Sequence, residues 1–438
     1  MLKSGFSSQY KYSKLRTSLD HYSRKYKPYL LTSTKRCLFG SYIRWNENES
    51  SPDTRKQQIE FLRDHKERMA LEQLIYEYSR KPLKTYDFHA LTAQSEELSS
   101  PFLLQNAKDT IEELLKYNAK SIRAFRALPY LVLLNPSISE SYRHYLQTTS
   151  ALLMTSVLPP KSLEENDNLV SKILDEFIGI HADSLPSLSK GFAEVVNLMT
   201  VEQVKDFLDR YLKDRILMRM VAHQHVELSK TIRDETQFVP GSKYNGLIKP
   251  LNMIDVINKG ADLVNDILLM ESDQTVSITI DSSLPIEEDK PIIFPYIEYQ
   301  LDYVLIEIFK NAFRSQIENR VSSPVEVTVS LPSDSSYLEM RIRDRGKGIP
   351  PKVLPHIFDY SFTTWESTEG DSYKTLNLPP GMSAKSLAGV GYGLPLLRHY
   401  IEIFNNFASL EDKSFTHGLL TVQSYLNWGT DVYIKLKC

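Results

Sequence analysis

Residues 305–314 read LIEIFKNAFR, and they lie in an apolar pattern that predicts a helix over residues 296–318. One side of this helix is apolar at helical spacing, through Leu301, Val304, Leu305, Ile308 and Ala312. Polar groups at positions i, i+3, i+4 and i+7 share another side, namely Glu307, Lys310, Asn311 and Arg314. Taken alone, this helix fits a solvated Glu–Lys pair better than a functional site.

A second polar segment follows the predicted strand 337–343. Residues 343–350 read RDRGKGIP, in which Gly346 and Gly348 permit tight backbone turns beside a ligand. The carboxylate of Asp344, just past the strand, can accept a hydrogen bond from an exocyclic amine such as that of adenine. The alternative is an ordinary polar hairpin turn.

A third segment, residues 387–395, reads LAGVGYGLP and begins a predicted helix that runs to about residue 404. Gly389, Gly391 and Gly393 leave backbone N–H groups bare near the helix start, where they can bind phosphates. The spacing is neither GxGxxG nor GxxxxGK[ST], which disfavours a dinucleotide-binding fold and a P-loop. The His-Arg-Asp and Asp-Phe-Gly motifs of eukaryotic-type protein kinases are absent from the sequence.

Helices and strands interleave around these three segments. A helix is predicted over residues 251–270, and strands over residues 276–280, 325–330, 337–343, 418–426 and 431–437. Strand pairs at hairpin spacing dominate the end of the chain. This pattern predicts a domain over residues 245–438, with a mixed sheet covered by helices on one face.

The preceding part of the chain is helical. Long amphipathic segments cover residues 103–125, 137–158, 163–180 with 187–197, and 201–231. Pro159-Pro160, Pro186 and Pro240-Gly241 interrupt or end the pattern. We therefore expect an α+β protein, with an antiparallel four-helix bundle over residues 55–240 followed by an α/β sandwich.

Composition excludes several classes of protein. The 438 residues are 42% hydrophobic and 24% charged, which rules out a disordered chain. No apolar run approaches the roughly 18 residues that a membrane span needs. The net charge of -3 argues against general nucleic-acid binding. The two cysteines, Cys37 and Cys438, give no disulfide framework, so a reducing compartment is expected.

Residues 1–45 differ from the rest of the chain in charge. They carry ten Lys or Arg and one acid, Asp20, which gives +9 and leaves -12 for the remainder. They are rich in Ser and Tyr and have no apolar core. This composition predicts a mitochondrial transit peptide and disordered start over residues 1–50, removed after import. A solvated basic tail that binds acidic partners is the alternative.

The order and spacing of the motifs are more specific than any one of them. Glu-x-x-x-Asn on a helix, Asp-x-Gly-x-Gly, a long loop, Gly-x-Gly-x-Gly and a final Gly-Thr-Asp at residues 429–431 resemble the GHKL ATPase superfamily. That superfamily includes gyrase, heat-shock chaperones, sensor histidine kinases and MutL repair proteins. The resemblance implies a GHKL-type ATP-binding domain that binds ATP and Mg²⁺ under a mobile lid, here about residues 349–388.

Within that superfamily, the chain most resembles the mitochondrial pyruvate dehydrogenase kinase and branched-chain ketoacid dehydrogenase kinase family. EIFKNAFR at residues 307–314 is similar to the family's ELFKNAMR, and GYGLP at residues 391–395 matches its glycine box. In the helical part, LDRY at residues 208–211 and the QH pair at residues 224–225 resemble the family's last bundle helix. The resemblance covers roughly residues 65–438.

This resemblance implies a role for each matching residue. Glu307 would be the general base and Asn311 the Mg²⁺ ligand, with Lys310 and Arg314 near the phosphates. Around adenine, the ATP-binding residues would be Asp344, Gly346, Gly348 and Thr430. The lid contacts would be Thr363 and Thr364. The phosphate loop would comprise Gly389, Val390, Gly391, Tyr392, Gly393 and Leu394.

The resemblance also implies an activity and a location. We expect a protein-serine kinase in the mitochondrial matrix that phosphorylates and inactivates the E1 alpha subunit of the pyruvate dehydrogenase complex. The lipoyl domain of the E2 core is an expected partner, and a homo- or heterodimer is expected. Pyruvate dehydrogenase kinases usually carry a histidine four residues before the base, where this chain has Tyr303. The chain also ends at Cys438, without the longer tail that many of these kinases exchange across their dimer.

Three other functions remain open from the sequence. One is a branched-chain 2-oxoacid dehydrogenase kinase. Another is a protein-histidine kinase with His225 or His223 as phosphoacceptor, although a lone histidine in a bundle is more often a packed group. The third is a non-catalytic ATP-binding scaffold, which retention of Glu307, Asn311 and both glycine segments argues against.

Overall fold

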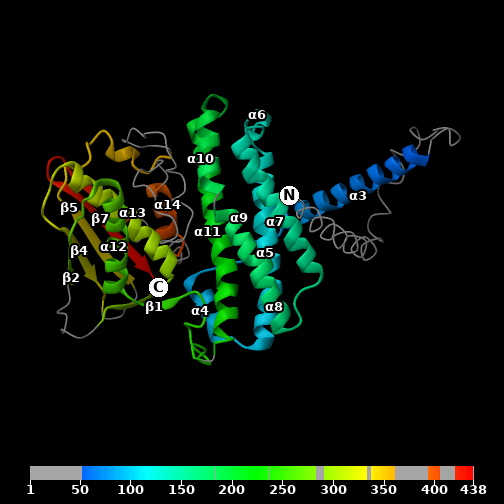
Figure 1. Cartoon of the computed structure of the whole chain (residues 1–438), viewed down its shortest axis with the longest axis horizontal. Coiled ribbons are helices and arrows are strands. Elements are labelled where there is room, and N and C mark those ends of the chain that lie inside the picture. The colour runs from blue at the N-terminus through cyan, green and yellow to red at the C-terminus, as the bar shows by residue number, and fades with distance from the viewer. Residues whose placement is uncertain are drawn as a thin grey trace.

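The computed structural model describes residues 52–182, 184–234, 236–282, 291–332, 337–360, 393–404 and 420–437. Figure 1 shows a group of helices from the first half of the chain beside a sheet domain from the second half. The expected α+β fold with a mixed sheet is confirmed. Within the part of the chain that the structure describes, no helix is both long and apolar enough to span a bilayer.

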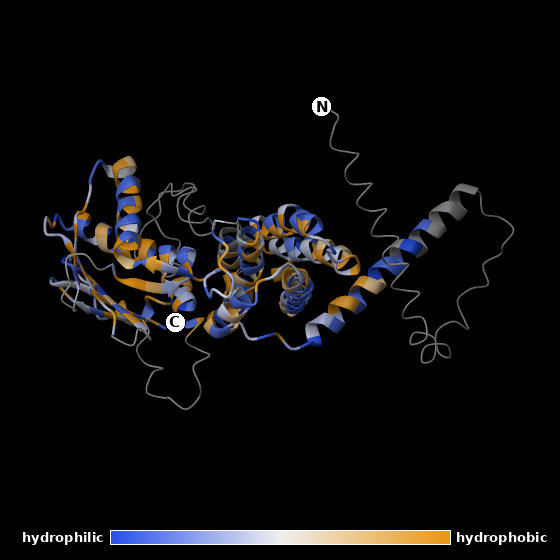
Figure 2. Ribbon diagram, turned by 90° about the horizontal axis from the view of Figure 1, so that it is seen from below, coloured by the Kyte–Doolittle hydropathy of each residue, from blue (hydrophilic) through white to orange (hydrophobic). Residues whose placement is uncertain are grey.

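The first half is helical from its first described residue. Its helices are α3 (Pro52–Arg80), α4 (Phe88–Glu96), α5 (Ser100–Arg126), α6 (Tyr130–Leu133), α7 (Pro136–Val157), α8 (Leu163–Leu169), α9 (Asp175–Ala182), α10 (Ser184–Glu194) and α11 (Val201–Thr231). A π-helical turn, Val170–Leu174, joins α8 to α9. The bundle is built from α5, α7, the α8–α10 run and α11, while the end of α3 packs on α5 and its first half projects away (Figures 1 and 2).

Local signals set the ends of the bundle helices. Ser99 caps α5, and Thr200 and Gln203 form a reciprocal capping box at the start of α11. The predicted interruption at Pro186 is wrong in position, because this proline lies in the first turn of α10. The first N–H groups of a helix have no partner within the helix, so a proline there costs no hydrogen bond.

The second half forms a five-stranded sheet in the order β2-β4-β5-β7-β6. Strands β2 (Ile278–Ser282) and β4 (Val325–Ser330) are parallel, and the other neighbours are antiparallel. The remaining strands are β5 (Tyr337–Asp344), β6 (Leu420–Tyr425) and β7 (Gly429–Lys437). The helices α12 (Met253–Ser272), α13 (Glu298–Glu318) and α14 (Gly393–Glu402) accompany the sheet (Figure 1).

Alternation along β5 explains why the helices pack on one face of the sheet. Leu338, Met340 and Ile342 are at most 2% exposed, whereas Glu339 between them is exposed. Residues two apart on a strand point to the same face, so the apolar set faces the helices. The sequence pattern predicted this arrangement correctly.

Two details of this domain differ from the sequence prediction. The strand expected at residues 276–280 begins at Ile278, because the Asn265 side chain of α12 pairs with both backbone groups of Val276, at 2.9 and 3.0 Å. A two-stranded ribbon, β1 (Lys249–Asn252) with β3 (Ile293–Tyr296), was not predicted. Each of its strands has four residues, too few for a periodic signal.

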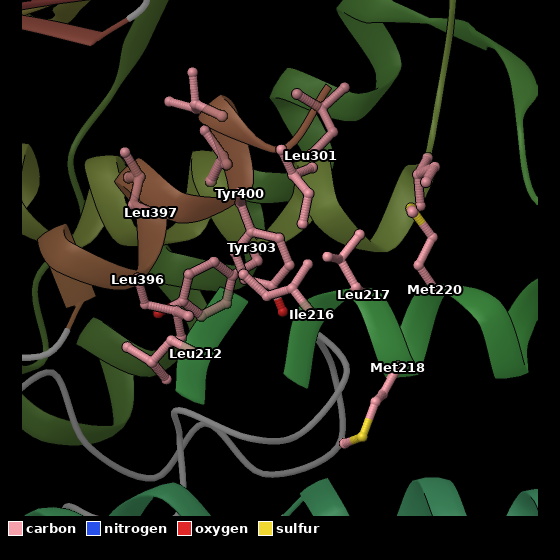
Figure 3. Packing of buried hydrophobic residues seen from close by; sticks show 14 of the residues in the cluster. Leu212, Ile216, Leu217, Met218, Met220, Leu301, Tyr303, Leu396, Leu397 and Tyr400 are labelled. Carbon is pink, nitrogen blue, oxygen red and sulfur yellow. The ribbon is translucent and has the colours of Figure 1, made fainter. Parts of the chain in front are cut away.

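The bundle and the sheet domain share an apolar interface. Figure 3 shows Leu212 and Ile216 of α11 close to Leu396 and Tyr400 of α14, with Tyr303 of α13 beside them. All five side chains are buried. Helix α14, which begins with Gly393, therefore packs on both the sheet domain and the bundle.

A buried polar group ties the bundle helices together. His225 of α11 is completely buried, and its ring nitrogens lie 2.7 Å from Asn106 Oδ1 on α5 and 2.9 Å from Asn166 Oδ1 on α8. Burial lowers the pKa of His225 to about 4, so the ring is neutral at neutral pH. A neutral ring has a single N–H, so it donates to one of these two oxygens, and the cluster is a buried polar part of the core.

Replacing His225 by alanine should destabilise the bundle by about 2–4 kcal/mol, because a cavity forms and two buried asparagine side chains lose a partner. Chemical denaturation followed by circular dichroism would measure this loss. His89→Ala, at an exposed position on α4, is the matched control and should change stability by less than about 0.5 kcal/mol. Equal stability of the His225 variant and the wild type would contradict the assignment.

Candidate functional site

Helix α13 carries a buried ion pair. Glu307 and Lys310 are 6% and 5% exposed, and Lys310 Nζ lies 2.9 Å from Glu307 Oε1. The two residues are three apart and therefore adjacent on one helix face. Charges this deeply buried are uncommon unless they are paired, so the sequence alternative of a solvated pair is wrong.

The start of α14 meets this ion pair. A Cβ atom added to Gly393 would overlap the Glu307 carboxylate, so a larger residue here would have to displace that side chain. The structure therefore brings the last glycine of the glycine box against the carboxylate of the other motif. Leu394 follows in the first turn of α14 and is half-buried.

The other two polar residues of α13 are arranged differently. Asn311, one turn after Glu307, is exposed. The guanidinium Nε of Arg314 lies 2.8 Å from Glu318 Oε1 at the end of the helix. The predicted polar face thus divides into a buried pair next to Gly393 and an accessible amide and cation further along.

A second buried carboxylate lies at the end of β5. Asp344 is 6% exposed and lies opposite Thr430 of β7, which is 8% exposed. Its Oδ1 accepts hydrogen bonds from the Gly346 N–H at 2.8 Å and from the Ser315 hydroxyl at 3.2 Å. Burial raises the pKa of the Asp344 carboxyl, and the hydrogen bonds from Gly346, Ser315 and the Thr430 backbone only partly oppose this effect.

The sequence analysis missed Ser315 as a member of the site. A Cβ atom on Gly346 would overlap the Ser315 hydroxyl, so the serine and the glycine fit each other closely. The signal was present, because residues 307, 311 and 315 recur at four-residue spacing on one face of α13. Eight residues of helix separate Glu307 from Ser315 by about 12 Å, which suits an elongated ligand.

Ser424 is a second missed residue, with no signal in the sequence. Its hydroxyl lies 2.9 Å from Thr430 Oγ1 and accepts the Ile349 N–H at 2.7 Å. It therefore joins the β6–β7 hairpin to the turn that contains Gly348 and Asp344. Gly348 adopts φ +72°, and an added Cβ atom would overlap the Tyr425 carbonyl oxygen, which explains the glycine there.

Six residues of the predicted site lie outside the described residues: Thr363, Thr364, Gly389, Val390, Gly391 and Tyr392. Their assignments to the lid and the phosphate loop stay predictions. The described residues on either side of them are Tyr360 and Gly393.

The geometry disfavours a phosphoacceptor histidine in the bundle. His225 is buried, and an asparagine side chain lies within 2.9 Å of each of its ring nitrogens. His223 accepts a hydrogen bond from Arg219 Nε at 3.3 Å, and burial lowers the pKa of His223 to about 3. A phosphoacceptor needs an accessible nitrogen, which His225 does not offer, and Nε2 of His223 is occupied by Arg219.

Two family models match this chain. Residues 297–438 match the histidine kinase-, DNA gyrase B- and HSP90-like ATPases, so the sheet domain is an ATPase domain of the GHKL class. Residues 86–249 match the model described as mitochondrial branched-chain alpha-ketoacid dehydrogenase kinase. The two matches cover the bundle and the site in turn.

Curated relatives agree with these models. The mitochondrial pyruvate dehydrogenase (acetyl-transferring) kinase 1 of Saccharomyces cerevisiae is 31% identical over 398 residues, which cover 90% of this chain and 94% of that protein. Isozyme 4 of the corresponding mitochondrial kinase from Mus musculus is 28% identical over 387 residues, 83% of each chain. The chain belongs to the family of mitochondrial pyruvate dehydrogenase and branched-chain ketoacid dehydrogenase kinases, as its motifs predicted.

Replacing Asp344 by alanine should weaken ATP binding roughly 100-fold, because the buried site loses its charged acceptor for an exocyclic amine. Isothermal titration calorimetry on the folded variant would measure the change. Ser315→Ala keeps the carboxylate but removes one of its donors, so a smaller loss is expected. Asp281→Ala, at an exposed position on β2, should bind ATP normally. Unchanged ATP affinity in Asp344→Ala would make this carboxylate structural only.

Replacing Glu307 by glutamine should leave ATP binding intact and slow phosphoryl transfer roughly 100-fold or more, the scale of general-base removal. Single-turnover transfer from labelled ATP would separate this step from binding. Glu298→Gln, at the exposed start of the same helix, is the matched control. Near-normal transfer by Glu307→Gln would leave this residue with a supporting role alone.

Proposed function

We propose that this protein is an ATP-dependent serine kinase that phosphorylates and inactivates the E1 alpha subunit of the pyruvate dehydrogenase complex in the mitochondrial matrix. One observation carries the catalytic part of the proposal. The buried Glu307 carboxylate lies against Gly393, at the start of the helix that follows the glycine box. The names of the curated relatives support the choice of substrate.

Phosphoryl transfer requires positioned charges and one base on the attacking hydroxyl. Bound ATP would supply the phosphoryl group, and Mg²⁺ would neutralise charge that develops on the phosphates. Glu307 accepts the proton of the attacking serine hydroxyl, a role that a carboxylate beside the phosphates can fill. Lys310 is the counter-charge that makes burial of this carboxylate tolerable before substrate arrives.

The remaining residues bind and orient the nucleotide. Asp344 accepts a hydrogen bond from the adenine amine, with Ser315 and Gly346 holding its carboxylate in place. Thr430 contributes a hydroxyl on the same side, fixed by Ser424. The backbone N–H groups at the start of α14, with the positive end of its helix dipole, would bind the phosphates of ATP.

The residues of the site fit a magnesium ion held largely by ATP itself. The described residues contain no cluster of three His, Cys, Asp or Glu side chains that would bind a metal unaided. Mg²⁺ in kinase sites is usually held by substrate phosphates, waters and one or two protein oxygens. The exposed amide of Asn311, one turn after Glu307, supplies one such oxygen.

The branched-chain 2-oxoacid dehydrogenase kinase is a second candidate, and a specific observation favours it. The bundle matches the model named for that kinase. The position four residues before Glu307 also differs from the histidine that pyruvate dehydrogenase kinases usually have there. Tyr303 is 8% exposed there, and its ring lies 5.0 Å from that of Tyr400 (Figure 3). In that case the kinase would catalyse the same phosphoryl transfer on the E1 alpha subunit of the branched-chain complex.

One end of the bundle supports docking to the complex, for which we propose the lipoyl domain of the E2 core. Tyr130 and Leu131 of α6 are 74% and 61% exposed, and Val201 at the start of α11 is 73% exposed. A hydrogen bond of 2.8 Å between Asn135 and Glu194 joins the start of α7, just after α6, to the end of α10, which precedes α11 in the chain. Exposed apolar side chains gathered in this way are typical of a protein interaction site. We also propose that the protein acts as a homo- or heterodimer.

Incubation with labelled ATP and each purified E1 subunit would test the proposed function. We expect label on a serine of the pyruvate dehydrogenase E1 alpha subunit, stable to acid, with loss of dehydrogenase activity. The Glu307→Gln variant serves as the control and should transfer little label. Label on the branched-chain subunit instead would change only the substrate.

Two other outcomes would overturn the proposal. Acid-labile label on the kinase itself, lost in His225→Ala, would indicate a histidine kinase. ATP hydrolysis without transfer to any E1 subunit would indicate a scaffold of the chaperone type.

A further inference from the structure

Three polar side chains from distant parts of the chain meet between the bundle and the ATP-binding domain. Asp209 lies on α11, Tyr360 follows the 3₁₀ turn Leu354–His356, and His399 lies on α14. The Tyr360 hydroxyl donates to Asp209 Oδ1 and lies 2.9 Å from His399 Nε2. His399 Nε2 also lies 3.2 Å from Asp209 Oδ1.

Asp209 is the acceptor at the centre of this cluster. Burial alone would raise the pKa of its carboxyl, but the hydrogen bonds from His399 and Tyr360 outweigh burial and lower it. The carboxylate is therefore ionised at neutral pH. A proton on His399 Nε2 satisfies the geometry. That N–H can donate to Asp209 Oδ1 and to the Tyr360 oxygen, while the Tyr360 hydroxyl donates to Asp209. Hydrogen bonds to an ionised acceptor are the stronger kind.

The Asp209–Tyr360–His399 cluster fixes the relative position of the two helices that form the apolar interface of Figure 3. Leu396 and Tyr400 of α14 pack on Leu212 and Ile216 of α11, and such contacts tolerate sliding. Hydrogen bonds do not, because they weaken steeply with distance and angle. His399 is six residues after Gly393, about 9 Å along the helix. Fixing His399 on α11 thus fixes where the start of α14 meets Glu307.

Tyr360 joins a second part of the chain, the residues that follow the turn Leu354–His356, to the same cluster. It is the last described residue before residues 361–392, and Gly393 is the first described residue after them. The pairing of Tyr360 with His399 joins the two described stretches that flank this interval. Asp209 attaches both to the bundle.

We infer that Asp209, Tyr360 and His399 are positioning residues, which set the start of α14 and its glycine against Glu307 and so couple the helical bundle to nucleotide binding. This inference rests on the proposed function, because it assigns the start of α14 to the phosphates of ATP. None of the three residues touches the reacting atoms in this arrangement.

The test measures ATP affinity by calorimetry on the full chain, with no protein substrate present. His399→Leu, Tyr360→Phe and Asp209→Asn should each raise the Kd for ATP roughly 10-fold, from loss of one charge-assisted hydrogen bond. Asp209→Asn combined with His399→Leu should lose little more than either single variant, since both remove the same contact. Asp206→Asn, at an exposed position one turn earlier on α11, is the control and should bind ATP normally.

A conservative variant separates positioning from packing. His399→Gln keeps an N–H donor near the place of Nε2 and should restore most of the ATP affinity that His399→Leu loses. In steady-state assays, the KM for ATP should rise in His399→Leu more than kcat falls, because saturating nucleotide can itself draw the start of α14 into place.

Wild-type ATP affinity in His399→Leu and Tyr360→Phe would overturn the inference, as would equal losses in the glutamine and leucine variants. Failure of the proposed function would look different. The wild type would then bind ATP with the same dependence on these residues but transfer no phosphate to an E1 subunit.

Discussion

Burial of the Glu307–Lys310 pair is the constraint on which the rest of the site depends. Two charges on one helix face, both at most 6% exposed, must be enclosed by well-packed neighbours and held near each other. Gly393 is a close neighbour of this pair, because a side chain there would have to displace the Glu307 carboxylate. The start of α14 therefore lies directly against the Glu307 carboxylate.

Helix α13 organises the remainder of the site from this point. Its apolar side packs with α12 and the sheet, which holds its polar side toward the ligand. Two turns beyond Glu307, Ser315 contacts Asp344 at the end of β5. One rigid helix thus sets the distance between Glu307, the carboxylate proposed for phosphoryl transfer, and Asp344, the carboxylate proposed to bind adenine.

The helical bundle supports the ATP-binding domain, and some of its buried polar residues hold the bundle itself together. His225 illustrates this, since its two ring nitrogens join α5, α8 and α11 within the core. Helix α11 then presents Leu212 and Ile216 to α14 (Figure 3), and Asp209 of the same helix contacts His399 of α14. A change in the bundle that moved α11 would consequently also move the start of α14.

Local pattern determined much of this protein from the sequence alone. The span of α11 was predicted to the residue, the α+β fold and the mixed sheet were predicted correctly, and the motif order indicated the family. These features depend on spacing of 3.6 or 2 residues and on glycines at helix starts, which are local properties. The contact of Gly393 with Glu307, the Ser315–Asp344 hydrogen bond and the Asp209–Tyr360–His399 cluster were decided only by the tertiary structure. They join residues far apart in the chain, and such contacts follow from the packing of whole helices and sheets, which no local pattern encodes.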